Sequence, residues 1–220
     1  MTSTNRIAIV DYGMGNLRSV EQALRHVADG AEVMLASTPG VIETADRVVF
    51  PGQGAMRDCM AELDARNLRQ AVKDAAASKP FLGICIGLQM LFEHSEEGDA
   101  AGLGILPGQV RRFASDMKSA DGQRLKVPHM GWNQVAQKPH ALWSDIADQA
   151  FFYFVHSYHV VPDEPSLVVG QTEYGIPFTT AVARDNIFAI QCHPEKSARD
   201  GLQLLRNFVN WAPMMPLSPI

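Results

Sequence analysis

The segment from Pro80 to Gln89 constrains the fold more than any other part of this chain. Its first part, at 81–84, is typical of a short buried strand, and a helical pattern of apolar residues follows at once. Cys85 stands between them, with Gly83 and Gly87 on either side. This arrangement permits a tight strand-to-helix turn that lifts the cysteine clear of the sheet, where the helix N-terminus favours a thiolate. The segment predicts an α/β fold that presents a candidate nucleophile.

A second segment, near the end of the chain, offers a base for that nucleophile. Residues 187–192 form a strand-like apolar run that ends in His193-Pro194-Glu195. The residue before a proline favours extended geometry, so His193 and Glu195 are expected to point to the same side. An imidazole beside a carboxylate is the base-and-orienter half of a catalytic triad.

Each feature also has a simpler explanation. A lone cysteine such as Cys85 is as often a small buried hydrophobe, and a His-Pro-Glu string alone is usually a surface turn. The glycine-flanked cysteine together with a strand-terminal His-Pro-Glu favours catalysis, because both are needed for one constellation.

Composition limits the class of protein. The 220 residues, 46% of them hydrophobic, predict a single domain spanning 1–220, and a formal charge of −5 gives no indication of a nucleic-acid partner. Three cysteines, Cys59, Cys85 and Cys192, show no disulfide or zinc spacing, so we expect a reduced, cytoplasmic protein with no metal or cofactor. No segment approaches the roughly 20 apolar residues of a membrane span, and no signal segment is expected.

Strand and helix patterns alternate in the first half of the chain, whereas strands dominate after Gly98. We expect a mostly parallel sheet covered on both faces, extended by antiparallel strands, with a tight hairpin at Asp185-Asn186 and a closing helix. The predicted strands cover 6–10, 31–35, 47–50, 81–84, 108–113, 126–135, 151–155, 168–171, 178–183 and 187–192, and the predicted helices begin at Asn16 and fill 51–78 with a break near Asn67.

The segment Asp11–Asn16 contains a Gly-x-Gly pair between a strand and a helix, which suggests a dinucleotide-binding loop. Arg18 stands where that motif needs a small residue, so a tight turn at the functional edge of the sheet is the better interpretation.

Taken together, Gly83–Gln89, Val155–Tyr158 and His193–Glu195 resemble the class I (triad) glutamine amidotransferases over nearly the whole chain. The resemblance implies a three-layer, flavodoxin-like α/β fold. Three segments, at 10–16, 126–133 and 153–158, are similar to the glutaminase subunits of imidazole glycerol phosphate synthases, which serve histidine biosynthesis.

The resemblance also implies roles for single residues. Cys85 would be the nucleophile, His193 the acid and base, and Glu195 its orienting carboxylate. The remaining implied site residues bind the oxyanion or the ends of glutamine: Gly52, Gln53, Ile86, Gln89, Ser157 and Tyr158. The family loop usually has valine where this chain has Gln53, which bears on loop mobility more than on mechanism.

The implied partner is a (β/α)₈-barrel cyclase, bound as a heterodimer, which receives ammonia through a channel and forms imidazole glycerol phosphate and an aminoimidazole carboxamide ribotide. Met130, Trp132, Asn133 and Lys196 are the candidate interface residues, although core packing for Trp132 and solvation for Lys196 explain them almost as well. The remaining histidines of interest, His129, His156 and His159, are expected to be structural or to lie at the rim of the site, and Cys59 and Cys192 to be packing residues.

Two alternatives stay open at this point. The chain would share its triad with the glutaminase of another synthase, such as that for pyridoxal phosphate, or with a free-standing γ-glutamyl hydrolase. It would share its fold with a catalytically inactive interaction module. We expect the free subunit to be nearly silent, because unregulated hydrolysis wastes glutamine.

Overall fold

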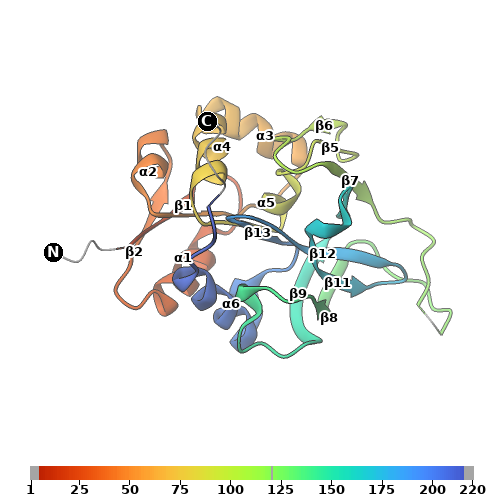
Figure 1. Cartoon of the computed structure of the whole chain (residues 1–220). Helices are drawn as coiled ribbons and strands as arrows, with labels where there is room; N and C mark the ends of the chain where they lie inside the picture. The colour runs from red at the N-terminus through yellow and green to blue at the C-terminus, as the bar shows by residue number, and fades with distance from the viewer. Residues whose placement is uncertain (1–4, 120, 216–220) are drawn as a thin grey trace.

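The computed structural model describes residues 5–119 and 121–215 (Figure 1). The helices are α1 (Leu17–Val27), α2 (Pro39–Thr44), α3 (Met56–Ala65), α4 (Arg69–Ser78), α5 (Ile86–Gln89) and α6 (Ala198–Asn210), with 3₁₀ turns at Ala141–Trp143, Pro165–Leu167 and Pro194–Lys196. The strands are β1 (Arg6–Val10), β2 (Glu32–Ala36), β3 (Arg47–Phe50), β4 (Phe81–Ile84), β5 (His94–Ser95), β6 (Ala100–Ala101), β7 (Gly108–Arg112), β8 (His129–Gln137), β9 (Ala150–His156), β10 (Tyr158–Pro162), β11 (Val168–Glu173), β12 (Pro177–Arg184) and β13 (Ile187–Ile190).

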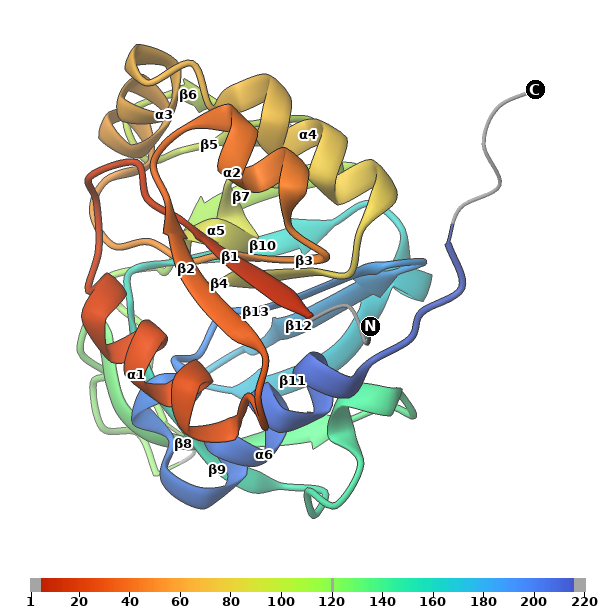
Figure 2. The same ribbon diagram turned by 90° about the vertical axis from the view of Figure 1, so that its left-hand side faces the viewer.

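The sheet separates two helical layers, as the α/β prediction requires. Helices α1 and α6 lie against one face, and α2, α3 and α4 against the other (Figures 1 and 2). Each layer has its own apolar core, because a sheet buried on both faces presents hydrophobic residues in both directions. In α1, Val20, Leu24 and Val27 are buried on one side of the helix.

The strand order is β2-β1-β3-β4-β13-β12-β10-β7-β5-β6, with β11 joining β12 to the β8–β9 pair. The first four strands are parallel neighbours, and the strands from β12 to β7 pair antiparallel. The last strand departs from the expectation of an antiparallel addition: β13 pairs parallel with β4. This placement puts the ends of β4 and β13 side by side, because parallel neighbours have their carboxyl ends at one edge.

The element boundaries confirm most of the sequence predictions. The break between α3 and α4 falls at Asn67, whose φ is +57°, and the β12–β13 hairpin turns at Asp185, whose φ is +51°. The prediction missed α2, β5, β6 and β10, and it started β8 three residues early. These missed elements are two to six residues long, too short for a periodic pattern to be distinguished from a loop.

Candidate active site

The strand-to-helix turn predicted around Cys85 is present. Cys85 follows β4 and precedes α5 with φ +56° and ψ −109°, a conformation that costs a non-glycine residue about 1–3 kcal/mol. Gly87 is required by packing, since a Cβ there would lie 1.8 Å from the carbonyl oxygen of Phe50 on β3. The side chain of Cys85 lines a cavity of about 460 Å³ at this edge of the sheet.

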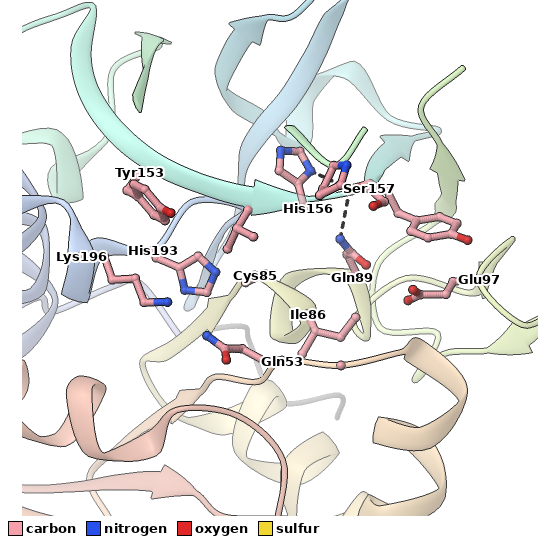
Figure 3. Close-up of a pocket in the computed structure, with 14 residues that line it drawn as sticks. Gln53, Cys85, Ile86, Gln89, Glu97, Tyr153, His156, Ser157, His193 and Lys196 are labelled. Carbon is pink, nitrogen blue, oxygen red and sulfur yellow. Dashed lines mark hydrogen bonds between the residues drawn. The ribbon is translucent and has the colours of Figure 1, made fainter. Parts of the chain in front are cut away.

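His193 and Glu195 meet beside that cysteine. The Nδ1 atom of His193 lies 2.8 Å from Oε1 of Glu195, and both side chains are only 2% exposed. His193 keeps extended backbone angles, as predicted for a residue before proline. Its Nε2 atom has no hydrogen-bond partner among the described residues, and His193 lines the same cavity as Cys85 (Figure 3). The free ring nitrogen is available to exchange a proton with the nucleophile.

The electrostatics favour a charged imidazole. Burial opposes the imidazolium, but the neighbouring Cys85 sulfur and the Glu195 carboxylate outweigh burial and raise the pKa of His193 to about 10. An imidazolium held next to a thiol stabilises the thiolate, which is the reactive form of cysteine.

The cavity also brings together the residues expected to bind glutamine. Gln53, Ile86, Gln89, Ser157 and Tyr158 all contribute to its walls, from the loop after β3, from α5 and from the β9–β10 junction. Gly52 borders a smaller adjoining cavity together with Gln53, His193 and Glu195.

The loop that carries Gly52 and Gln53 is held on both sides. The Tyr12 hydroxyl donates to the Pro51 carbonyl at 3.0 Å, and the Cys59 thiol donates to the Gln53 carbonyl at 3.7 Å. A Cβ at position 52 would lie 1.8 Å from the Tyr12 hydroxyl, so only glycine fits there. Cys59 is therefore more than the packing residue expected from the sequence, although burial keeps its thiol inert by raising its pKa to about 11.

The turn at Asp11–Asn16 packs against this loop. Gly13 and Gly15 have φ of +82° and +100°, and a Cβ on Gly15 would come within 3.0 Å of the Gly52 Cα. The prediction of a tight turn at the functional edge is confirmed. Asn16, where the first helix was expected to begin, directly precedes α1; its side chain donates to the Ser19 hydroxyl and makes no capping bond.

Sequence reasoning missed two polar residues of the site. Gln191, fully buried after β13, accepts from the Gln89 amide at 3.0 Å and donates to the Cys85 sulfur at 3.7 Å. Glu97 lines the cavity on the side of Gln89 (Figure 3), and burial raises the pKa of its carboxyl. Gln191 stood inside an apolar run, and Glu97 in a segment without a recognisable pattern.

The candidate interface residues separate into two groups. Met130 and Trp132 on β8 are 62% and 52% exposed, which rules out core packing for Trp132. Phe151 on β9 is also 52% exposed, and Tyr153 and Val155 of the same strand project to the same side by strand alternation. We call these five residues the β8–β9 apolar face. Asn133 points to the opposite side of β8, where its amide donates to the Glu173 carbonyl at 2.9 Å.

Lys196 and the other residues noted in the sequence have clear positions. Lys196 is half-buried and lines the cavity near His193 and Tyr153 (Figure 3). His129, His156 and His159 are buried, so of the two expectations for them the structural one applies, although His156 also contributes to the cavity wall. Cys192 is fully buried in the core, as expected.

Residues 5–119 and 121–215 contain no cluster of three or more histidine, cysteine or acidic side chains arranged to hold a metal ion. No helix in these ranges combines the length and apolar composition needed to cross a bilayer.

Comparison with known proteins assigns the chain to a family. The model of the glutamine amidotransferase class-I family matches residues 8–211. The imidazole glycerol phosphate synthase subunit HisH of Dechloromonas aromatica is 66% identical over 94% of this chain and 97% of its own length, and that of Aromatoleum aromaticum is 65% identical over 94% and 99%.

Solved structures agree on the fold. The structure of PurLQS from Thermotoga maritima superposes with a TM-score of 0.69 at 16% identity, covering 94% of this chain and 98% of that one. A glutamine amidotransferase from the same organism gives a TM-score of 0.62 at 17% identity, covering 89% and 78%. The strand-to-helix turn at Cys85 and the His193–Glu195 pair agree with the family match. This chain belongs to the class-I glutamine amidotransferases, in the group of imidazole glycerol phosphate synthase HisH subunits.

Proposed function

We propose that this chain is the glutaminase subunit of an imidazole glycerol phosphate synthase. It hydrolyses L-glutamine to glutamate and ammonia and delivers the ammonia to a (β/α)₈-barrel cyclase subunit. The observation that carries the proposal is the strained Cys85 turn beside the buried His193–Glu195 pair, both opening on one cavity. The proposed thiol nucleophile needs a reducing compartment such as the cytoplasm.

The first half of the reaction forms a thioester. The Cys85 thiolate attacks the side-chain carboxamide carbon of glutamine, and the developing oxyanion accepts hydrogen bonds from backbone N–H groups. Ile86 offers the first N–H of α5, which has no partner within the helix, and the Gly52-Gln53 loop offers others. His193 then gives its Nε2 proton to the departing ammonia, and the C–N bond breaks.

The second half regenerates the enzyme. Neutral His193 takes a proton from water, which attacks the thioester carbon and releases glutamate and the Cys85 thiolate. Glu195 keeps the His193 ring oriented throughout, because its carboxylate accepts the Nδ1 proton at 2.8 Å. Histidine is again an imidazolium, and the pair is ready for another glutamine.

The rest of the cavity suits the two charged ends of glutamine. Glu97 supplies a carboxylate and Gln89 an amide oxygen for the α-ammonium group. The Ser157 and Tyr158 backbone, at the turn between β9 and β10, lies across the cavity for the α-carboxylate. Substrate held at these groups has its side chain directed toward Cys85.

The β8–β9 apolar face is the proposed docking surface for the cyclase. Two of its residues, Tyr153 and Val155, also line the catalytic cavity, so a partner seated there would close the cavity and receive ammonia without exposure to solvent. Lys196 stands at the same opening with its charge available to an acidic group of the partner. Aromatic residues exposed together in this way are typical of interaction sites.

The test is glutamate release from glutamine by the wild-type chain and by Cys85→Ala. Each is assayed alone and with the barrel cyclase plus its ribonucleotide ligand. We expect activity that requires Cys85 and rises sharply with the liganded cyclase. Activity that needs Cys85 but ignores the cyclase would assign the glutaminase to another synthase, and no activity under any condition would leave an inactive interaction module.

A further inference from the structure

A chain of hydrogen bonds, buried between its two histidines, runs from the half-buried Asn133 to the wall of the catalytic cavity. The Asn133 amide nitrogen lies 3.3 Å from Nε2 of His129, and Nδ1 of His129 lies 3.0 Å from Nε2 of His156. Nδ1 of His156 then lies 2.7 Å from the Tyr158 carbonyl oxygen. The three side chains belong to the neighbouring strands β8 and β9, where His129 and His156 are direct cross-strand partners. The hydrolysis steps described above use none of these side chains.

The donor and acceptor of every bond in this hydrogen-bond chain are determined by the groups at its two ends, the Tyr158 carbonyl and the Asn133 amide. The Tyr158 carbonyl can only accept, so His156 carries its proton on Nδ1 and its Nε2 accepts from His129. His129 therefore also carries its proton on Nδ1, and its Nε2 accepts from Asn133. The Asn133 amide has two protons, and the second goes to the Glu173 carbonyl at 2.9 Å. The donors all point toward the cavity.

This assignment requires both imidazoles to be neutral, and their surroundings make them so. Burial lowers the pKa of His156 to about 3 and that of His129 to about 4. The ring of His129 is stacked between Tyr174 and Phe154, with centroid distances of 4.0 and 4.9 Å. Among the described residues, no carboxylate forms a hydrogen bond with His129 or His156 that would offset a charge on either ring.

The Tyr158 end of the hydrogen-bond chain contacts Gln89, which is proposed to bind glutamine. The Tyr158 carbonyl accepts a second hydrogen bond, from the Gln89 amide at 3.2 Å (Figure 3). The same amide nitrogen donates to Gln191 at 3.0 Å. Both protons of the Gln89 amide are therefore used, which fixes its orientation. The amide oxygen is left to accept a hydrogen bond from a ligand in the cavity.

We propose that Asn133, His129 and His156 are positioning residues: they form a one-way hydrogen-bond relay that holds the Tyr158 carbonyl, and through it the Gln89 amide, in the orientation that binds glutamine. This relay rests on the proposed glutaminase function. It acts on substrate recognition, since the proton transfers belong to His193. Met130 and Trp132 project from the other side of β8. The same strand therefore carries part of the relay on one side and the proposed docking surface on the other.

The first test measures the tautomers directly. In the wild-type chain labelled with ¹⁵N-histidine, we expect both His129 and His156 to be neutral near pH 7 and to carry their proton on Nδ1. Site-specific assignment uses His129→Asn and His156→Asn. An Nε2–H tautomer or an imidazolium at either position would overturn the relay, and this result does not depend on whether the chain hydrolyses glutamine.

The second test removes the relay's first donor. Asn133→Leu keeps the approximate size of the side chain, has no N–H to donate to Nε2 of His129, and adds no carboxylate that would charge that ring. In the complex with the liganded cyclase, we expect KM for glutamine to rise about five- to tenfold, the scale of one neutral hydrogen bond, with kcat within about twofold. The matched control is His159→Phe, a buried ring of the same cluster whose Nδ1 has no hydrogen-bond partner among the described residues; its KM should not change.

Two further measurements separate positioning from a general effect on the fold. Alkylation of Cys85 by iodoacetamide, which has neither an α-amino nor an α-carboxyl group, should keep its rate in Asn133→Leu, whereas inactivation by the glutamine analogue 6-diazo-5-oxo-L-norleucine should slow. His156→Asn retains a donor in place of Nδ1, so its KM should lie closer to the wild-type value than the raised KM of His156→Phe. An unchanged KM in Asn133→Leu, or equal slowing of both reagents, would refute the proposal.

Discussion

The catalytic cavity has one buried histidine, His193, beside Cys85, and a buried pair, His129 and His156, behind another part of its wall. The pKa values of the single ring and of the pair differ in direction. His193 is 2% exposed, and its pKa is raised to about 10 by the Cys85 sulfur and the Glu195 carboxylate in spite of burial. His129 and His156 are 3% and 6% exposed, and burial lowers their pKa to about 4 and 3. Rings with nearly equal burial therefore differ: the pKa values favour a charged imidazole at His193 and neutral imidazoles at His129 and His156.

The difference comes from the partners of each ring. A carboxylate accepts the Nδ1 proton of His193, whereas a carbonyl and a second imidazole are the partners of His156. A buried ring keeps a charge only when an opposite charge beside it offsets the cost of burial. In the proposed function, the charged ring moves protons and the neutral rings hold a carbonyl in place, so the two groups should affect different kinetic constants.

Removing the carboxylate from His193 should produce the largest effect. In Glu195→Gln we expect kcat for glutamate release to fall on the order of 10³-fold or more, as for orienting carboxylates in other triads. The pKa of His193 should fall, because one of the groups that raises it is gone. Steady-state kinetics and an NMR titration of the His193 ring measure the two effects. A kcat within tenfold of wild type would show that Glu195 does not orient the base.

The neutral group should make the fold sensitive to acid. An unfolded histidine binds a proton near pH 6.5, while folded His129 and His156 resist protonation down to about pH 4 and 3, so the unfolded state binds more protons between these values. Stability should therefore decline as pH falls from 6.5 toward 4, by on the order of 3 kcal/mol for each of the two rings. Burial also lowers the pKa of His159, which adds in the same direction.

Urea unfolding of the wild type and of His129→Phe/His156→Phe across this pH range measures that effect. The double variant should show a flatter dependence on pH, because two of the buried histidines that resist protonation have been removed. Equal slopes in the two proteins would mean that other titrating groups account for the acid sensitivity.

The smallest expected effect distinguishes the two sides of strand β8. Trp132→Ala should weaken binding of the cyclase about 10- to 30-fold, because an exposed aromatic at the centre of an interface contributes about 2 kcal/mol. At saturating cyclase its KM for glutamine should stay at the wild-type value, whereas Asn133→Leu should change KM and leave docking intact. Isothermal titration with the purified cyclase supplies the affinities. If Trp132→Ala also raised KM, the two sides of β8 would not act separately.

Local patterns in the sequence were sufficient for much of the site. Glycines around a cysteine after an apolar strand define a turn through short-range sterics. The extended geometry of His193 and its contact with Glu195 follow from the proline between them. These features depend on neighbours within a few residues, which a sequence displays directly.

Other features depend on contacts between distant segments. Gln191 contacts Gln89 across 102 positions, and Asn133, grouped with Trp132 by sequence proximity, points into a different part of the molecule. His156 was noted only as one histidine among several, and its role requires the register that pairs it with His129.

The sequence by itself determined the nucleophile, its base and orienting carboxylate as candidates, the α/β class and the family resemblance, because each is written in a short local pattern. The tertiary structure alone decided that β13 lies parallel to β4, which brings the cysteine and the histidine together. It also decided which buried histidine has a carboxylate beside it and which has a carbonyl. Charge in a protein interior depends on neighbours in space, and strand pairing determines those neighbours.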